Sequence, residues 1–111
     1  MYSKELIKGT LKPIILKLLE DNDRMYGYEI TQRVKELSQG KIEITEGALY
    51  PTLHKLEADG ILTTEKEYIG KRVRKYYSLT SSGNSTAAQK VSELTDFLAT
   101  VGSILKTKTA M

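Results

Sequence analysis

The stretch TEGALYPTLHKLEADG, residues 45–60, predicts one short helix whose two ends are both marked. Thr45 can act as N-cap, because its hydroxyl can accept a hydrogen bond from an otherwise unpaired N–H of the first turn. Gly60 suits the position after the helix, where the chain turns into a left-handed conformation. Leucines spaced at i, i+4 and i+7 give the helix one apolar face, made of Leu49, Leu53 and Leu56.

The opposite face of this helix is small at its start and polar or aromatic further along. It carries Gly47, Pro51, His54 and Ala58, flanked by Tyr50 and Lys55. A surface helix packed on a core would show this pattern. So would a recognition helix, since small Gly47 and Ala48 would let its N-terminus approach phosphates or base edges. Pro51 removes the hydrogen bond to the Gly47 carbonyl, which calls for a local reason such as an exposed carbonyl or a bent first turn.

Two helices are predicted upstream. The first covers residues 3–21, with Ser3 or Thr10 as N-cap, and the second covers residues 26–38. Their apolar positions recur with helical spacing: Leu11, Ile14, Ile15, Leu18 and Leu19 in the first, and Ile30, Val34 and Leu37 in the second. Residues 41–44, where two isoleucines flank a glutamate, form either a very short strand or an extended segment.

Downstream, residues 61–79 change to a period of two and predict a β-hairpin around a short glycine-containing loop. Its loop and second strand carry four cations, Lys71, Arg72, Arg74 and Lys75, next to Tyr76 and Tyr77. No acidic residue interrupts positions 71–83. A charged hairpin tip that keeps the chain soluble is one interpretation. The other is a wing whose cations lie against phosphates.

The last predicted helix covers residues 80–106, with Thr80, Ser81 or Ser82 as N-cap. Apolar residues spaced 4, 3, 4, 3 and 4 apart form a heptad seam, Ala87, Val91, Leu94, Leu98, Val101 and Leu105, with Phe97 and Ile104 beside it. A second copy of the chain, crossed or antiparallel, would bury this seam. Packing against the helix of residues 3–21 stays open, and the stripe is wide enough for both. Residues 107–111 are expected to fray.

Composition narrows the classes of function. The 111 residues include 17 basic and 14 acidic side chains, so the net charge is +3 and nucleic acid binding is permitted without being required. The absence of cysteine excludes disulfides, a thiolate nucleophile and a zinc–thiolate site. His54 is the single histidine and has no carboxylate cluster or nucleophile around it, so we expect no metal, no cofactor and no enzyme activity. Without a signal peptide or an apolar run near about 18 residues, we expect a cytoplasmic protein with no membrane contact.

The order helix, helix, helix, hairpin, long helix predicts an α+β, mainly α fold. This fold is a winged helix-turn-helix domain over residues 1–80, followed by a dimerisation helix and tail over residues 81–111. The expected partners are a second copy and double-stranded DNA with an inverted repeat, whose half-sites lie roughly one helical turn apart or a multiple of it. The expected DNA contacts are Thr45, Gly47, Tyr50, His54, Lys55, Lys71, Arg72, Arg74 and Lys75. A winged helix that binds another protein is the alternative, favoured by Glu46, Glu57, Asp59, Glu65 and Glu67.

Four stretches carry a family resemblance: KGTLKPIILKLLED at 8–21, YGYEI at 26–30, GALYPTLHKLEADGIL at 47–62 and RKYYSLTSSG at 74–83. In their order and spacing the chain resembles a PadR-family transcriptional regulator of the short type with one C-terminal helix. The resemblance implies a bacterial or archaeal dimeric repressor that binds a pseudo-palindromic operator, and it makes Pro51 a family habit. In some members an aromatic or drug-like molecule relieves repression.

Two positions depart from the family pattern. The wing turn reads Gly70-Lys71-Arg72-Val73, where the family often carries a proline or a second glycine, so the wing geometry does not carry over. The last helix lacks the tryptophan with which some short members sandwich flat drugs. Phe97 is the nearest aromatic residue on that helix, so a site for a small aromatic effector is a hypothesis resting on Phe97 and the helix of residues 3–21.

Overall fold

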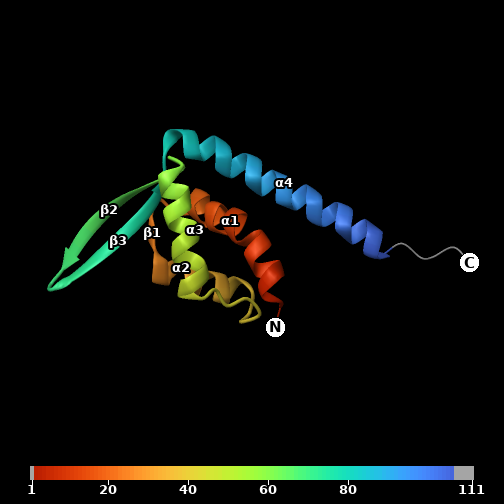
Figure 1. Cartoon of the computed structure of the whole chain (residues 1–111), viewed down its shortest axis with the longest axis horizontal. Helices are drawn as coiled ribbons and strands as arrows, with labels where there is room; N and C mark the ends of the chain where they lie inside the picture. Colours follow the sequence, from red (N-terminus) through yellow and green to blue (C-terminus); the bar gives the residue numbers. More distant parts are fainter. Residues whose placement is uncertain (1, 107–111) are drawn as a thin grey trace, which may run out of the picture.

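The computed structural model describes residues 2–106, so the predicted frayed tail at 107–111 lies outside the described residues. Along the chain the elements are α1 (Lys4–Asp21), β1 (Met25–Tyr26), α2 (Gly27–Leu37), α3 (Glu46–Ala58), β2 (Leu62–Ile69), β3 (Arg72–Leu79) and α4 (Ser81–Lys106). Figure 1 shows the hairpin and α4 projecting on opposite sides of a body made by α1, α2 and α3. The predicted α+β, mainly α winged helix-turn-helix fold is confirmed.

The predicted helix starts resolve to single caps. Ser3 caps α1 by accepting a hydrogen bond from the Leu6 amide at 3.3 Å. Thr10 lies inside α1 and donates its hydroxyl hydrogen to the Leu6 carbonyl at 2.9 Å, so the alternative start at Thr10 is wrong. At the start of α4 the Thr80 hydroxyl accepts from the Gly83 amide at 2.9 Å, which makes Thr80 the cap of that helix.

The helix α3 begins and ends as its sequence predicts. The Thr45 hydroxyl accepts a hydrogen bond from the Ala48 amide at 3.2 Å. Gly60 has φ of +75°, a left-handed conformation that costs glycine little, and it turns the chain from α3 into β2. Pro51 is accommodated inside the helix, and α3 continues past it to Ala58.

The sheet has the strand order β1-β3-β2, and both pairings are antiparallel. The hairpin register runs from Leu62 opposite Leu79 to Ile69 opposite Arg72, and Gly70 makes the turn with φ of +61°. β1 is only two residues long and pairs with β3 at Tyr76 and Tyr77. Lys41 lies in a bend and residues 42–44 have no regular secondary structure, so the very short strand considered there is wrong.

The core lies where α1, α2 and α3 meet the base of the sheet. Its largest fully buried side chains are Tyr77, Ile15, Leu16, Ile30, Leu49, Leu53 and Leu56. α4 contributes only Gly83 and Ala87 to the buried residues, both in its first two turns. Within residues 2–106, none of the helices has the length and apolarity that crossing a membrane requires.

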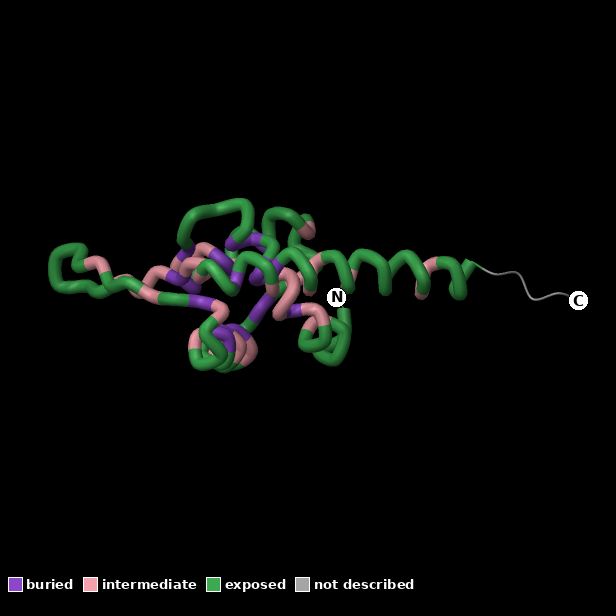
Figure 2. Tube along the Cα trace, turned by 90° about the horizontal axis from the view of Figure 1, so that it is seen from above, coloured by how far each residue is buried: buried purple, intermediate pink, exposed green. Residues whose placement is uncertain are grey.

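Beyond its first turns α4 runs past α1 and leaves the body, and Figure 2 shows its outer length almost wholly exposed. Val91 and Leu94 are half-buried, whereas Leu98 is 55% exposed and Leu105 is 79% exposed. The alternative of packing against the helix of residues 3–21 therefore holds for part of α4. The first half packs on α1, whereas most apolar side chains of the second half are exposed within residues 2–106.

Candidate nucleic-acid interface

One face of α3 is free of packing. Leu49, Leu53 and Leu56 point into the core. The exposed residues of the helix include Gly47, Pro51, His54, Lys55 and Ala58, together with the N-cap Thr45. This is the face that its sequence predicts for contact with bases. It is low in charge and small at its N-terminal end, which suits insertion into a major groove.

Tyr50 lies at the edge of this face and is half-buried. Its ring fills the space beside Gly27 at the start of α2, where an added Cβ would overlap the Tyr50 hydroxyl and lie 2.8 Å from its Cζ. The imidazole of His54 is next to it, with ring centroids 6.2 Å apart. Tyr50 thus joins the two helices of the helix-turn-helix, and its hydroxyl is turned toward the N-terminus of α2.

Glu57 of α3 forms a small polar cluster with two residues of the hairpin, on the side of the hairpin that faces α3. It accepts a hydrogen bond from the Thr64 hydroxyl at 3.0 Å and pairs with the Lys75 ammonium at 3.4 Å. The pKa of the Glu57 carboxyl is lowered, mainly by the hydrogen bond from Thr64 and to a smaller extent by the pairing with Lys75. The Lys75 ammonium also lies over the ring of Tyr77. Burial raises the pKa of the Tyr77 hydroxyl.

The opposite side of the hairpin is organised by Arg24, which the sequence analysis did not single out. Its guanidinium forms a fork to Glu65 at 2.7 Å and Glu67 at 2.6 Å, and it lies over the Tyr76 ring at 3.9 Å. The hydrogen bonds to Glu65 and Glu67 raise the pKa of Arg24. A sequence separation of 41 and 43 residues hides this contact from pattern analysis.

Four of the five acids that favoured a protein partner are therefore paired with cations. Glu65 and Glu67 bind Arg24, and Glu57 binds Lys75. The carboxylate of Asp59 is 3.3 Å from the Lys55 ammonium, one turn away on α3. Glu46 is the exception among the described residues. Pairing reduces the negative potential that these acids would otherwise project from the wing and α3.

The wing retains cations that no acid of the described chain holds. Lys71 and Arg72 are exposed at the turn without an ion pair within residues 2–106. Lys66 also has none in that range, and it lies directly across from Lys75, so the two share the sheet face that continues toward α3. The sequence analysis missed Lys66 because it stands between two glutamates. The period-two alternation, which puts Glu65 and Glu67 on the other face, was the signal that could have found it.

Arg74 is held differently from the other predicted wing cations. Its guanidinium lies over the Tyr26 ring at 4.4 Å, and that ring meets Tyr76 edge-on with centroids 5.5 Å apart. The stack Arg24, Tyr76, Tyr26, Arg74 thus connects the wing to the strand that precedes α2. Arg74 is half-exposed, and its guanidinium lies near the N-terminus of α2, because Tyr26 is the N-cap of that helix.

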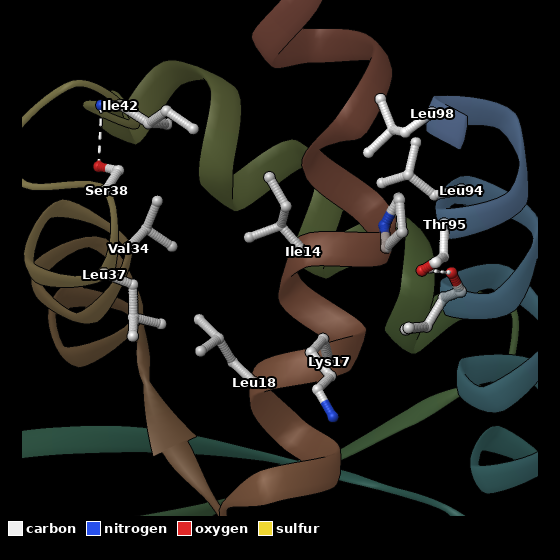
Figure 3. A pocket seen from close by; sticks show the side chains of 12 residues that line it. Ile14, Lys17, Leu18, Val34, Leu37, Ser38, Ile42, Leu94, Thr95 and Leu98 are labelled. Carbon is white, nitrogen blue, oxygen red and sulfur yellow. Dashed lines mark hydrogen bonds between the residues drawn. The ribbon is translucent and has the colours of Figure 1, made fainter. Parts of the chain in front are cut away.

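An apolar cavity of about 340 Å³ opens between α1, α2 and α4 (Figure 3). Its walls include Ile14 and Leu18 of α1, Val34 and Leu37 of α2, and Leu94 and Leu98 of α4. Phe97 is not part of this wall. It lines a separate cleft with Leu6, Gly9 and Thr10 of α1, so the structure does place Phe97 beside the first helix, as the effector hypothesis requires.

The predicted dimerisation seam has a gradient of exposure. Ala87 is buried, Val91, Leu94 and Val101 are half-buried, and Leu98 and Leu105 are exposed.

Among the described residues, no three His, Cys, Asp or Glu side chains gather in a way that could hold a metal ion.

Comparison with known proteins agrees with this geometry. Residues 15–89 match the model of the Transcriptional regulator PadR-like family. The transcriptional regulator Rv3488 of Mycobacterium tuberculosis is 35% identical over 86 residues, which are 78% of this chain and 77% of that protein. A transcriptional regulator from Clostridium thermocellum has a similar structure, with a TM-score of 0.83 and 27% identity over 96% of this chain and 100% of the other.

The PadR protein of Bacillus subtilis, solved in complex with operator DNA, is also similar. Its TM-score is 0.64 at 32% identity, and the match covers 71% of this chain and 45% of that protein. The family and these relatives are transcriptional regulators and not enzymes. The chain belongs to the PadR-like family of transcriptional regulators.

Proposed function

We propose that this regulator acts as a homodimer that binds an inverted-repeat operator in double-stranded DNA and represses transcription there. The observation that carries the proposal is the pairing of charges around α3. The helix presents a free face of low charge. The wing beside it keeps cations that form no ion pair within residues 2–106, while its two glutamates are paired with Arg24. The likeness to a PadR protein solved on its operator supports the same function. Repression follows most simply, because a dimer lying across an operator excludes other proteins from it.

In this proposal the residues of the interface have different tasks. Gly47 and Thr45 let the N-terminus of α3 approach the major groove, and His54 reads a base edge. Lys71 and Arg72 bind phosphates along the backbone or the adjacent minor groove. Lys55, Lys75 and Arg74 are already paired or stacked within the chain, so their contribution to DNA affinity should be smaller than that of the two turn cations.

The second copy covers the outer half of α4. The exposed seam residues Leu98 and Leu105, with Phe97 and Ile104 beside them, form an apolar stripe that an equivalent stripe can bury. The two α3 helices then face successive major grooves on one side of the duplex. A small aromatic effector would enter the cleft beside Phe97 and relieve repression by altering the spacing of the two winged domains.

Binding measured on operator and random duplexes at several salt concentrations tests the DNA proposal. Replacing Lys71 and Arg72 by alanine should weaken binding to both duplexes alike and reduce the salt slope by about 0.9 for each lost phosphate contact. Replacing His54 by alanine should cost on the order of 1–3 kcal/mol on the operator and much less on random DNA. Lys90→Ala on α4, which pairs with Glu93 at 3.7 Å, is the control and should bind like wild type.

The proposal fails if wild-type affinity shows no salt dependence and the wing variant binds like wild type. The effector part fails on its own if diverse aromatic compounds neither shift the melting temperature nor release the operator.

A further inference from the structure

A groove runs along α3 on the side away from the wing. It lies between the N-terminal half of α3 and the first two turns of α1, and its volume is about 500 Å³. Ile7, Leu11 and Ala48 form an apolar part of its lining, and the lysines of α1, Lys4 and Lys8, line it as well. Figure 1 shows that the start of α1 and the start of α3 lie at the same end of the body.

The groove and the wing flank the free face of α3 on opposite sides. The wing touches α3 through Glu57, whereas α1 approaches it at Ala48. These two residues are nine positions apart, and at about 100° per residue they project about 180° from one another. His54 lies between these two directions on the exposed side of the helix. A duplex seated on the free face would therefore meet the wing along one edge and α1 along the other.

The charge along the α1 edge suits a polyanion. Lys4 and Lys8 are exposed and one helical turn apart, so they lie on the same edge of α1. Neither has an ion pair with another residue of the described chain. The groove contains one acid, Glu43, whose carboxylate is 3.5 Å from the Lys35 ammonium. Glu5 lines the separate cleft beside Phe97. The rim of the groove is therefore positive where it continues from the free face of α3.

We propose that Lys4 and Lys8 form a second phosphate-binding edge, so that the DNA backbone is held on both sides of α3. The inference rests on the proposed DNA-binding function and extends its interface beyond the wing to α1. Its occupant is the phosphodiester backbone of the same duplex that α3 reads. Two ammonium groups that form no ion pair within residues 2–106 can each replace a condensed counterion there, which makes the contact independent of base sequence.

The test compares operator binding by wild type, Lys4→Gln/Lys8→Gln, Lys71→Gln/Arg72→Gln and the combined quadruple variant between 50 and 200 mM salt. Loss of two phosphate contacts should reduce the slope of log affinity against log salt by about 1.8. Wild type should then lose about twelvefold more affinity over this range than the α1 variant. The reductions in the two double variants should sum in the quadruple variant, because the two edges are separated by the width of α3. Lys4→Arg/Lys8→Arg should keep the wild-type slope.

Lys90→Gln removes one lysine charge from α4 and serves as the control for a charge lost away from the proposed interface. The inference is overturned if the α1 variant keeps the slope of this control, even when its affinity is lower, because that result indicates an indirect effect. In that case a reduced slope in the wing variant leaves the proposed function standing. A wild type without salt-dependent binding would overturn both. Exposed lysines contribute little to folding, so the melting temperatures of all variants should match.

Discussion

Replacing Leu98 by alanine should weaken dimerisation by an amount that follows from its exposure. Its side chain is 55% exposed in one chain, so about half of it is left for a second copy to bury. Complete burial of a leucine stabilises by about 1.5–3 kcal/mol, so half of it contributes about 0.8–1.5 kcal/mol per copy. The two-fold axis doubles this to about 1.5–3 kcal/mol, which raises the dimer dissociation constant roughly 10- to 150-fold.

Leu98→Glu should have a larger effect, because it would put a carboxylate without a partner in the apolar seam of both copies. Sedimentation equilibrium over a range of concentrations measures the dissociation constants, and operator affinity should fall in parallel with them. Thr100→Glu, at an exposed position outside the seam, adds the same charge and should leave the dimer intact. A wild type that is monomeric at micromolar concentration, or a Leu98→Glu variant that dimerises like Thr100→Glu, would refute the proposed seam.

Four further variants probe the fold in urea or thermal unfolding. Gly83→Ala should destabilise the fold by about 1–3 kcal/mol, because its methyl group would overlap the Ile61 carbonyl oxygen. Gly9→Ala should stabilise it by about 0.5–1 kcal/mol, because its methyl group meets no described atom within 4 Å outside its own helix. Equal effects of the two substitutions would contradict this difference in packing. The lowered pKa of Glu57 adds stability above its unfolded-state pKa, and this stability is lost as the pH falls through its folded-state pKa. Glu57→Gln should therefore flatten the acid side of the profile of melting temperature against pH. An unchanged profile would rule out this contribution of Glu57. Arg24→Ala should lower the melting temperature only slightly, since its ion pairs are partly exposed, and should speed hydrogen exchange in the hairpin. Unchanged exchange would mean that Arg24 does not hold the wing.

Local signals were sufficient for most of the secondary structure. Thr45 caps α3 and Gly60 ends it, because both effects depend on backbone geometry within one turn of the residue concerned. β1 was not predicted, since a strand of two residues has no period of its own. It exists because Tyr76 and Tyr77 offer it a partner edge, and those residues are 50 or more positions away along the chain.

The candidate site was predictable in its exposed residues and less so at its edges. His54 and Gly47 lie on the free face because the three leucines of α3 fix the opposite one. Tyr50 projects about a quarter turn from those leucines, where a helical wheel cannot tell burial from exposure. Tyr50 is partly buried because Gly27 has no side chain, and the space left there accepts the Tyr50 ring. The sequence could not show which cations form ion pairs, because Arg24 and Lys75 are paired with acids of other elements.

The net charge of +3 underestimates what a duplex would meet. Electrostatic interactions in salt decay over about 8–10 Å, so a phosphate responds to the nearby side chains and not to the sum over the chain. Around α3, Glu57 and Asp59 are each paired with a lysine, and the two hairpin glutamates share the single positive charge of Arg24. The remaining charge at the wing is positive, at Lys66, Lys71 and Arg72. We therefore expect DNA binding with a salt dependence set by the wing cations that form no ion pair within residues 2–106.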